Sequence, residues 1–316
     1  MILAADFGGA SIKLGLVREN RVVARSRLET RPEYSFADTL EAVATEWGSL
    51  LKSQGLTLAD IAGAGLALPF LINVETQRVE GKFEKFPGAA AMDFKSWSRS
   101  RLGFPVALEN DLRAALLGEQ AAGAARGKTD VVMLAFGTGI GCAAMVGGRL
   151  LRGAKNRAAA LMGHSTIAYD RPVGRCGNIG CAEDLASTAT LSRLATAQPE
   201  YAASKLAGVA KIDYKIIFTF AAQGDVCAQS ILRKSLSVWS VLVQNAVIAY
   251  DPEMVVLGGA ILRSHEVILP AVREHLRRHM PSLALEIPIV VSALGDDAAL
   301  IGCAVMAGQP GSISTL

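Results

Sequence analysis

The sequence predicts an α/β protein built from two similar lobes that face each other across a central cleft. Its 316 residues exceed the usual size of a single hydrophobic core, and 51% of them are apolar. Two stretches, residues 2–29 and 131–153, each have the pattern of strand, glycine corner, strand, tight turn and strand. Helical and strand patterns follow each stretch, which indicates a duplicated unit of three antiparallel strands with a helix and strand extension.

The elements between these stretches support the same fold class. Residues 36–54 have an apolar stripe at helical spacing, with Ser35 as N-cap and Gly55 as the stop. Buried strands are expected at 63–69, 106–108, 254–259 and 287–292, and a helix begins near Asp111. We expect an N-terminal lobe over 1–115 and a C-terminal lobe over 116–316, with a final helix near 297–307 that packs back on the N-terminal lobe.

The two strand–corner–strand stretches match in pattern when Gly8 is placed on Gly137. Leu14 then meets Ala143, and the second stretch has one residue fewer in its second turn. Backbone N–H groups at a glycine corner are not obstructed by side chains, so they can hold phosphate oxygens. The alternative for each corner is a simple hairpin turn.

Composition excludes several classes of protein. The net charge of +3 is small and the basic residues are scattered along the chain, which is not the pattern of a nucleic-acid-binding face. The apolar segments are interrupted before about 18 residues, so we expect no membrane span. The first strand starts at Ile2 and leaves no room for a signal peptide, so a cytoplasmic location is expected.

Five cysteines, an odd count, favour reduced thiols or a metal over a disulfide framework. Cys142, Cys227 and Cys303 lie in apolar settings and are expected in the core.

Four motifs resemble those of the sugar kinases of the ROK family, within the actin-like ATPase superfamily. They are "DFGGASIKLGL" (6–16), "END" (109–111), "FGTGIG" (136–141) and "GH…CGNIGCAE" (163–183). Their order and spacing agree from residue 2 to about residue 307. The resemblance implies a two-lobed actin-like ATPase (ribonuclease H-like) fold with duplicated βββαβα units and a central cleft. No winged-helix segment precedes the first glycine corner, which disfavours the repressor branch of the family.

The resemblance implies ATP and Mg²⁺ as cofactors and assigns residues to them. Asp6 would hold hydrated Mg²⁺, and phosphate contacts would come from Gly8, Gly9, Lys13, Gly137, Thr138 and Gly139. Gly258 and Gly259 would pack beside adenosine. Structural alternatives remain open for three of these assignments: Asp6 stabilising its own turn, Lys13 as a solvated strand residue, and the Gly258–Gly259 pair allowing a close helix–strand contact.

For the sugar, the resemblance implies Asp111 as general base and Asn110, His164 and Glu183 as binding residues. An alcohol is a poor nucleophile until its proton has an acceptor, which is why a carboxylate is needed. Asn110 and Asp111 also stand where Asn and Asp cap helices for structural reasons.

The chain departs from the family pattern at several positions. Ala10 stands where a Thr is usual, Leu161 where a Glu is expected to accept sugar hydroxyls, and Lys85 where an Asn is usual. Because the changes at 161 and 85 fall on the substrate side, they indicate a changed substrate more than a dead nucleotide site.

A fourth departure affects a metal. Family members hold one structural zinc with a His and three Cys; here Gly174 replaces the first Cys and leaves His164, Cys176 and Cys181. Zn²⁺ completed by water or Asp170, and a loop that folds without metal, both remain open.

The sequence therefore predicts an ATP-dependent kinase that phosphorylates a hydroxyl of a sugar or amino sugar. The alternative is a catalytically weak, sugar-binding regulatory protein of the same family without a DNA-binding domain. A structural or chaperone ATPase is disfavoured by the 163–183 motif. The expected partners are the sugar and ATP, with no nucleic acid or membrane, and the family implies a homodimer.

Overall fold

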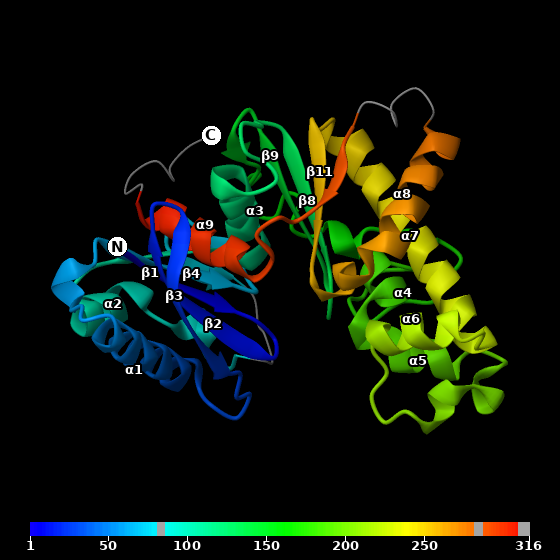
Figure 1. The fold of residues 1–316 in the computed structure, drawn as a ribbon, viewed down its shortest axis with the longest axis horizontal. Helices are drawn as coiled ribbons and strands as arrows, with labels where there is room; N and C mark the ends of the chain where they lie inside the picture. The colour runs from blue at the N-terminus through cyan, green and yellow to red at the C-terminus, as the bar shows by residue number, and fades with distance from the viewer. Residues whose placement is uncertain (81–85, 281–286, 309–316) are drawn as a thin grey trace. The chain divides into compact units, whose positions relative to one another are not determined.

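The computed structural model describes residues 1–80, 86–280 and 287–308. The chain separates into two compact units (Figure 1). The first contains Met1–Gly127, Leu150–Ala158 and the described chain from Ser292 onward; the second contains Lys128–Arg149 and Ala159–Val291. The expected boundary after residue 115 lies inside α3 (Asp111–Ala122), which stays whole in the first unit because it packs along its length against α9 (Ala298–Ala307).

The first unit is built on a five-stranded sheet with the order β3-β2-β1-β4-β7. The first three strands in sequence are antiparallel, and β4 and β7 are parallel to β1. A separate short hairpin is formed by β5 and β6. The strands are β1 (Ile2–Phe7), β2 (Ser11–Arg18), β3 (Arg21–Glu29), β4 (Gly63–Leu68), β5 (Leu71–Asn73), β6 (Arg78–Glu80) and β7 (Val106–Asn110).

The second unit repeats this sheet with the order β10-β9-β8-β11-β12. Again one strand pair is antiparallel at the glycine corner, and β11 and β12 run parallel to β8. The expected duplication is therefore present in the strand order and direction. The strands are β8 (Val131–Phe136), β9 (Ile140–Val146), β10 (Arg149–Leu150), β11 (Met254–Gly258) and β12 (Ile289–Val291).

The register of the two sheets corrects the expected alignment by one residue. Ala5 pairs with Leu14 in the first sheet, and its counterpart Leu134 pairs with Cys142 in the second. Leu14 therefore corresponds to Cys142, not to Ala143. The second tight turns have equal length, so the missing residue belongs to the glycine corner of the second unit.

Helix α1 (Phe36–Ser53) shows how the sequence pattern sets the first core. Ser35 caps it by accepting a hydrogen bond from the backbone N–H of Asp38 at 3.1 Å. The expected apolar stripe is buried, and the Trp47 indole donates to the carbonyl of Ala4 in β1 at 3.2 Å. The other helices of eight or more residues are α2 (Phe94–Leu102), α6 (Tyr214–Ala222), α7 (Val226–Tyr250) and α8 (His265–His279); α4 (Ala182–Ala186) and α5 (Leu191–Thr196) are shorter.

Helix α9 lies against β1, β4 and α3 of the first unit (Figure 1). The contact with α3 is made by glycines, because a Cβ on Gly118 would lie 2.0 Å from the carbonyl oxygen of Ala298. A Cβ on Gly302 would lie 1.7 Å from the carbonyl oxygen of Ala114. No other residue type fits at either position without moving one helix.

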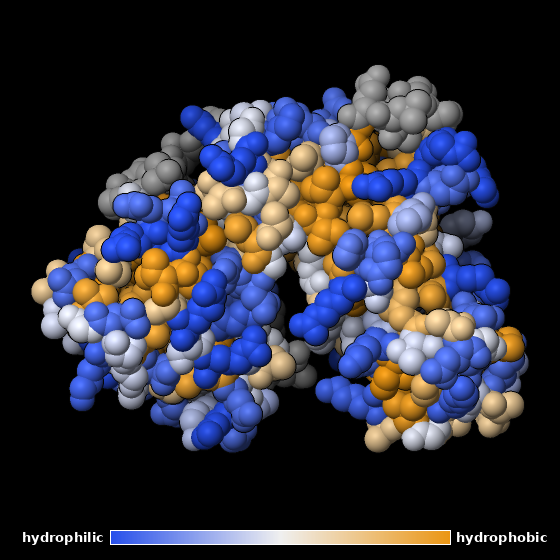
Figure 2. Space-filling model, viewed as in Figure 1, coloured by the Kyte–Doolittle hydropathy of each residue, from blue (hydrophilic) through white to orange (hydrophobic). Residues whose placement is uncertain are grey.

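The surface is mixed in character. Figure 2 shows charged and polar residues interspersed with apolar ones over both units. Within the described ranges, we find no helix with the length and apolar character that crossing a bilayer demands.

We expect Gly302→Ala to lower the free energy of unfolding by about 1–3 kcal/mol, because the added methyl group must push α3 and α9 apart. The matched control is Gly48→Ala in α1, where a Cβ meets nothing within 4 Å. This exposed helical glycine should gain about 0.5–1 kcal/mol on replacement by Ala. Urea unfolding of both variants tests the contact, and an equal effect of the two substitutions would contradict it.

Candidate functional site

The first glycine corner joins β1 to β2 and has Asp6 and Lys13 at its base. Asp6 is 8% exposed, and its Oδ2 lies 3.2 Å from the Lys13 Nζ, which also lies 2.8 Å from the Oδ1 of Asp296. Burial raises the pKa of Asp6 against the opposing effect of Lys13. Burial also lowers the pKa of Lys13, but the two carboxylates outweigh it and leave that pKa above its usual value. Lys13 is thus an ion-paired residue rather than a solvated one.

The backbone of this corner is partly used by its own turn. The Gly8 N–H donates to the Ser11 carbonyl at 3.0 Å, and the Thr30 hydroxyl donates to the Gly8 carbonyl at 2.8 Å. Gly9 and Ala10 are exposed. Any phosphate contact of this corner therefore falls to Gly9 and Ala10 more than to Gly8.

Asn110 and Asp111 stand where β7 ends and α3 begins. The Asn110 Oδ1 accepts from the N–H groups of Leu112 and Arg113, each at 3.2 Å, so Asn110 does cap the helix. The Asp111 Oδ1 accepts from Leu112 N at 2.8 Å and from Asn110 Nδ2 at 2.9 Å. Burial, reinforced by the negative charge of Asp6, raises the pKa of Asp111 to about 7. At neutral pH this carboxyl group can therefore both accept and release a proton.

A buried charge network supports this segment, and it is absent from the sequence-based predictions. Glu109 is almost fully buried; its Oε1 accepts from Asn110 N at 2.9 Å, and its Oε2 lies 2.6 Å from Arg152. Arg113 lies 3.8 Å from Glu109 and donates to the carbonyl of Ala158 at 2.9 Å. No local signal marked this network, because Glu109 lies in β7, outside the helix of Arg113, and Arg152 is distant in the sequence.

The second glycine corner, Gly137–Gly139, is held by chain that follows α4. The carbonyls of Gly137 and Thr138 accept from the N–H groups of Thr188 and Ala189 at 3.0 and 3.1 Å. Glu183, predicted to bind sugar, also packs under this corner: its Oε2 accepts from Ile140 N at 2.9 Å.

The glycine pair at the end of β11 has a packing reason. Gly258 pairs with Ala135 of β8, and Gly259 has φ +89° with its Cα facing the backbone of Phe136. A Cβ on Gly259 would lie 2.3 Å from the Phe136 carbonyl oxygen. The sequence left a close helix–strand contact as the alternative to adenosine binding. The contact observed is a different one, between Gly259 and the backbone at the end of β8.

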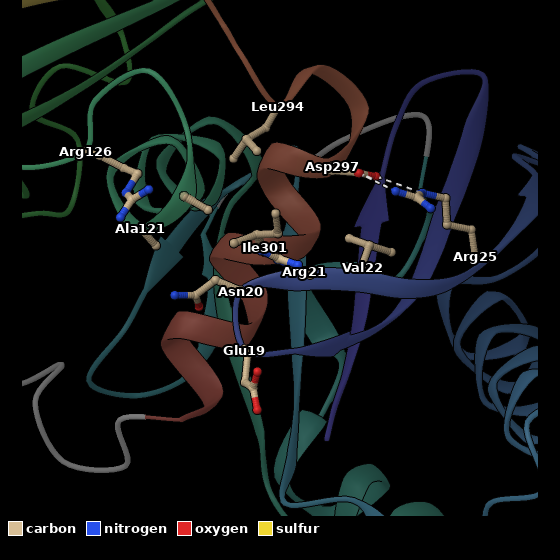
Figure 3. Close-up of a pocket in the computed structure, with 11 residues that line it drawn as sticks. Glu19, Asn20, Arg21, Val22, Arg25, Ala121, Arg126, Leu294, Asp297 and Ile301 are labelled. Carbon is tan, nitrogen blue, oxygen red and sulfur yellow. Dashed lines mark hydrogen bonds and ion pairs between the residues drawn. The ribbon is translucent and has the colours of Figure 1, made fainter.

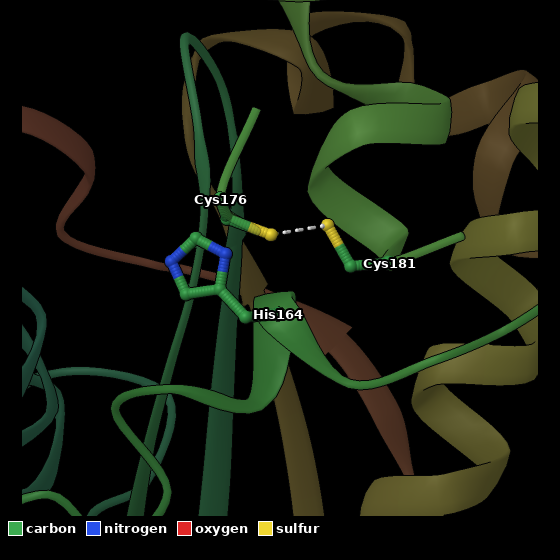
Figure 4. Close-up of side chains that lie close together, drawn as sticks. All are labelled: His164, Cys176 and Cys181. Carbon is green, nitrogen blue, oxygen red and sulfur yellow. Dashed lines mark hydrogen bonds between the residues drawn. The ribbon is translucent and has the colours of Figure 1, made fainter. Parts of the chain in front are cut away.

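His164, Cys176 and Cys181 come together in the second unit. One ligand atom from each lies within 4.8 Å of the others, and the two sulfurs are 3.2 Å apart. Figure 4 shows one ring nitrogen of His164 facing the sulfurs and the other turned away. The His164 Nδ1 is buried without a hydrogen-bond partner among the described residues, which fits a nitrogen meant for a metal. Cys142, Cys227 and Cys303 are buried, as expected for core thiols.

Of the two departures from the family pattern on the substrate side, Leu161 and Lys85, the structure describes only Leu161. Leu161 is 43% exposed, and its carbonyl accepts from the N–H of His164 at 2.9 Å, so it lies one turn before the histidine. Lys85 lies outside the described residues.

A cavity of about 510 Å³ lies elsewhere in the first unit, between the β2–β3 turn, the end of α3 and the start of α9 (Figure 3). At its edge the Arg25 Nε donates to the Oδ1 of Asp297 at 3.0 Å. None of the predicted site residues is among the described residues that line it. It is therefore not the predicted kinase site.

Comparison with known proteins decides the family. A family model described as the ROK family matches residues 2–309. The chain belongs to the ROK family. A glucokinase of Thermotoga maritima is 31% identical to this ROK protein, over 96% of each chain. A xylose repressor of Bacillus spizizenii is 28% identical over 77% of this chain and 60% of the repressor.

A solved structure supports the fold of this ROK protein. The ROK family glucokinase from Streptomyces griseus, in complex with glucose and AMPPNP, superposes with a TM-score of 0.76 at 27% identity, covering 98% of this chain and 99% of that one. The predicted family and the actin-like ATPase fold class are confirmed.

The raised pKa of Asp111 has a consequence for stability. Between its ordinary value of 3.8 and about 7, the folded ROK protein binds more protons than the unfolded chain, so the free energy of unfolding falls as pH rises. Asp111→Asn removes this dependence. At pH 8 we expect the free energy of unfolding of the variant to exceed that of the wild type by about 1–2 kcal/mol. Partial exposure of the carboxyl to water keeps the difference this small. At pH 4 the two proteins should differ little.

Urea unfolding at the two pH values measures this difference. Asp93→Asn is the matched control, because Asp93 caps α2 and its pKa is lowered by the Ser96 N–H. Its effect should have the opposite sign at pH 8. A stability gain of Asp111→Asn that is the same at both pH values would disprove the raised pKa.

Proposed function

We propose that this sugar kinase transfers the γ-phosphoryl group of ATP to a hydroxyl group of a sugar or amino sugar, with Asp111 as the general base. The enzyme class rests on glucokinase relatives that match over the full chain. The observation that carries the choice of base is the half-buried Asp111 carboxyl at the start of α3, with a pKa of about 7. A base is most effective when its pKa lies near the working pH.

In the proposed reaction, Asp111 accepts the proton of the sugar hydroxyl while the hydroxyl oxygen bonds to the γ-phosphorus. The bond from that phosphorus to the bridging oxygen breaks, and ADP leaves. Asn110 supports this step, because its amide donates to the Asp111 Oδ1 at 2.9 Å and fixes the direction of the carboxyl. The Asn110 amide also donates to the Phe70 carbonyl at 3.3 Å. We propose that a neighbouring sugar hydroxyl replaces this longer bond.

The phosphate side is assigned to residues of both glycine corners. In the first unit, Gly9, Ala10 and Lys13 are proposed to contact phosphate oxygens, with a smaller part for Gly8 because its N–H closes the turn. In the second unit the contacts are assigned to the Gly137–Gly139 corner with its Thr138 hydroxyl. Bound Mg²⁺ would neutralise phosphate charge, and Asp6 is the residue proposed to hold it through water. Gly258 and Gly259 are proposed to lie beside adenosine.

On the sugar side we assign His164 and Glu183 together with Asn110. The ring nitrogen of His164 that is turned away from the sulfurs is available for a hydroxyl group, so one ring can serve metal and sugar. We also propose that His164, Cys176 and Cys181 hold a structural Zn²⁺.

The alternative function is sugar binding without efficient catalysis, as a regulatory protein. The similarity to a xylose repressor favours it. Turnover separates the two functions, because a regulatory protein would bind sugar without releasing ADP. A homodimer is the proposed assembly in either case.

Asp111→Asn should leave sugar affinity largely unchanged and lower kcat by about 10²–10⁴-fold, because the amide cannot accept the proton of the hydroxyl. A coupled assay of ADP release gives kcat, and calorimetric titration gives sugar affinity. Asp93→Asn, the same change at the start of α2 in the same unit, should keep full activity. Undiminished turnover by Asp111→Asn would remove Asp111 as the base.

Leu161→Glu should raise kcat/KM for unsubstituted glucose by about tenfold or more, because it adds a bidentate acceptor for sugar hydroxyls. Wild type and variant are compared over hexoses, 2-acetamido sugars and ketoses, with ATP and with polyphosphate as donors. Leu161→Met is the control, since it changes shape without adding an acceptor. If the acceptor profile of Leu161→Glu equals that of the wild type, position 161 does not face the sugar.

A further inference from the structure

The cluster of His164, Cys176 and Cys181 has three ligands where structural zinc takes four. Position 174 stays beside the cluster although it lacks a thiol. Gly174 N donates to the Asn178 carbonyl at 2.8 Å, and the Asn178 side chain donates to the His164 carbonyl at 2.7 Å. The loop is thus tied to the histidine segment without any metal.

A carboxylate stands where a side chain at position 174 would extend. A Cβ built on Gly174 would lie 2.8 Å from the carboxyl carbon of Asp184 and 2.9 Å from its Oδ2. Asp184 is only 9% exposed, and its N–H donates to the sulfur of Cys181 at 3.4 Å. A cysteine at 174 and this placement of Asp184 exclude each other, so the two positions share one space.

We propose that Asp184 takes the place of the missing cysteine as the fourth zinc ligand. This inference rests on the zinc site of the proposed function. Aspartate oxygens bind Zn²⁺ at a distance close to that of histidine nitrogens. One carboxylate with two thiolates carries the same formal charge as three thiolates, so replacing the third cysteine by an aspartate leaves the charge around Zn²⁺ unchanged. A water molecule as fourth ligand would carry one negative charge fewer.

Binding requires a side-chain rotation of Asp184. The ligand atoms of His164, Cys176 and Cys181 lie within 4.8 Å of one another, and the Asp184 oxygens are not part of this group. The Asp184 Oδ2 forms an ion pair with Arg193 at 2.8 Å. The Arg193 side chain is 52% exposed, so this pair is weak enough to adjust. Asp170 is a poorer candidate, because its side chain is 70% exposed and faces Arg171.

The test measures zinc stoichiometry and affinity, by elemental analysis and by competition with a chromogenic chelator. The wild type should bind one Zn²⁺ per chain, and Asp184→Asn should bind it at least about tenfold more weakly. Two matched controls should bind like the wild type. Asp170→Asn removes the competing carboxylate, and Arg193→Gln removes the ion pair while keeping the ligand.

The double variant Gly174→Cys with Asp184→Ala supplies a third thiol and the room for it. It should recover the affinity lost in Asp184→Asn and, with Co²⁺ in place of Zn²⁺, increase the thiolate-to-metal absorption. Circular dichroism confirms that each variant is folded.

Wild-type affinity in Asp184→Asn would overturn the inference, as would an equal loss in Arg193→Gln or a double variant that fails to recover. A wild type that binds no zinc would overturn both the zinc site and this ligand. ADP release at saturating sugar, measured on the same samples, keeps the kinase function separate, because the proposed base is Asp111 and the metal loop acts on turnover through the sugar contact of His164.

Discussion

The contact between α3 and α9 is the constraint on which the first unit depends. Gly118 and Gly302 bring the two helix backbones closer than any side chain would allow, so the geometry of the pair has little freedom. Since α3 begins at Asp111, the contact that places the helix also places the proposed base. The turn that leads into α9 carries Asp296, which pairs with Lys13 at the first glycine corner. Base and phosphate corner therefore share one support.

Buried carboxylates complete this support. The Glu119 carboxylate in α3 accepts from the N–H groups of Ala124, Ala293 and Leu294 and so fixes the chain entering α9. Glu109, in β7 just before the helix begins, binds Arg152 and the N–H of Asn110. Each charge is costly to bury unless it is fully paired. The contacts of Glu119 with Ala293 and Leu294, and of Glu109 with Arg152, join segments far apart in the sequence, and no local pattern predicts them.

Local pattern was enough for the strands of the two five-stranded sheets, for the stripe of α1 and for the strand ends at Asp6, Asn110 and Gly137. It missed the β5–β6 hairpin, whose strands have three residues each. It was not enough for the register between the two units. β2 and β9 each contain four consecutive buried residues, so they lack the alternation that fixes which residue faces which side. A shift of one residue left the apolar pattern intact, and only the strand pairing revealed that the second glycine corner is the shorter one.

The metal loop shows a different limit of sequence-based prediction. Taken singly, Gly174 is a lost ligand, and Asp184 is an ordinary acidic residue in the first turn of a short helix. The structure places the Asp184 carboxyl in the space of the missing side chain, so the two positions form one paired change. A side chain at position 174 would therefore require the Asp184 carboxyl to turn away from its present place. A departure from a family motif is therefore a loss only when no neighbour occupies the space it leaves.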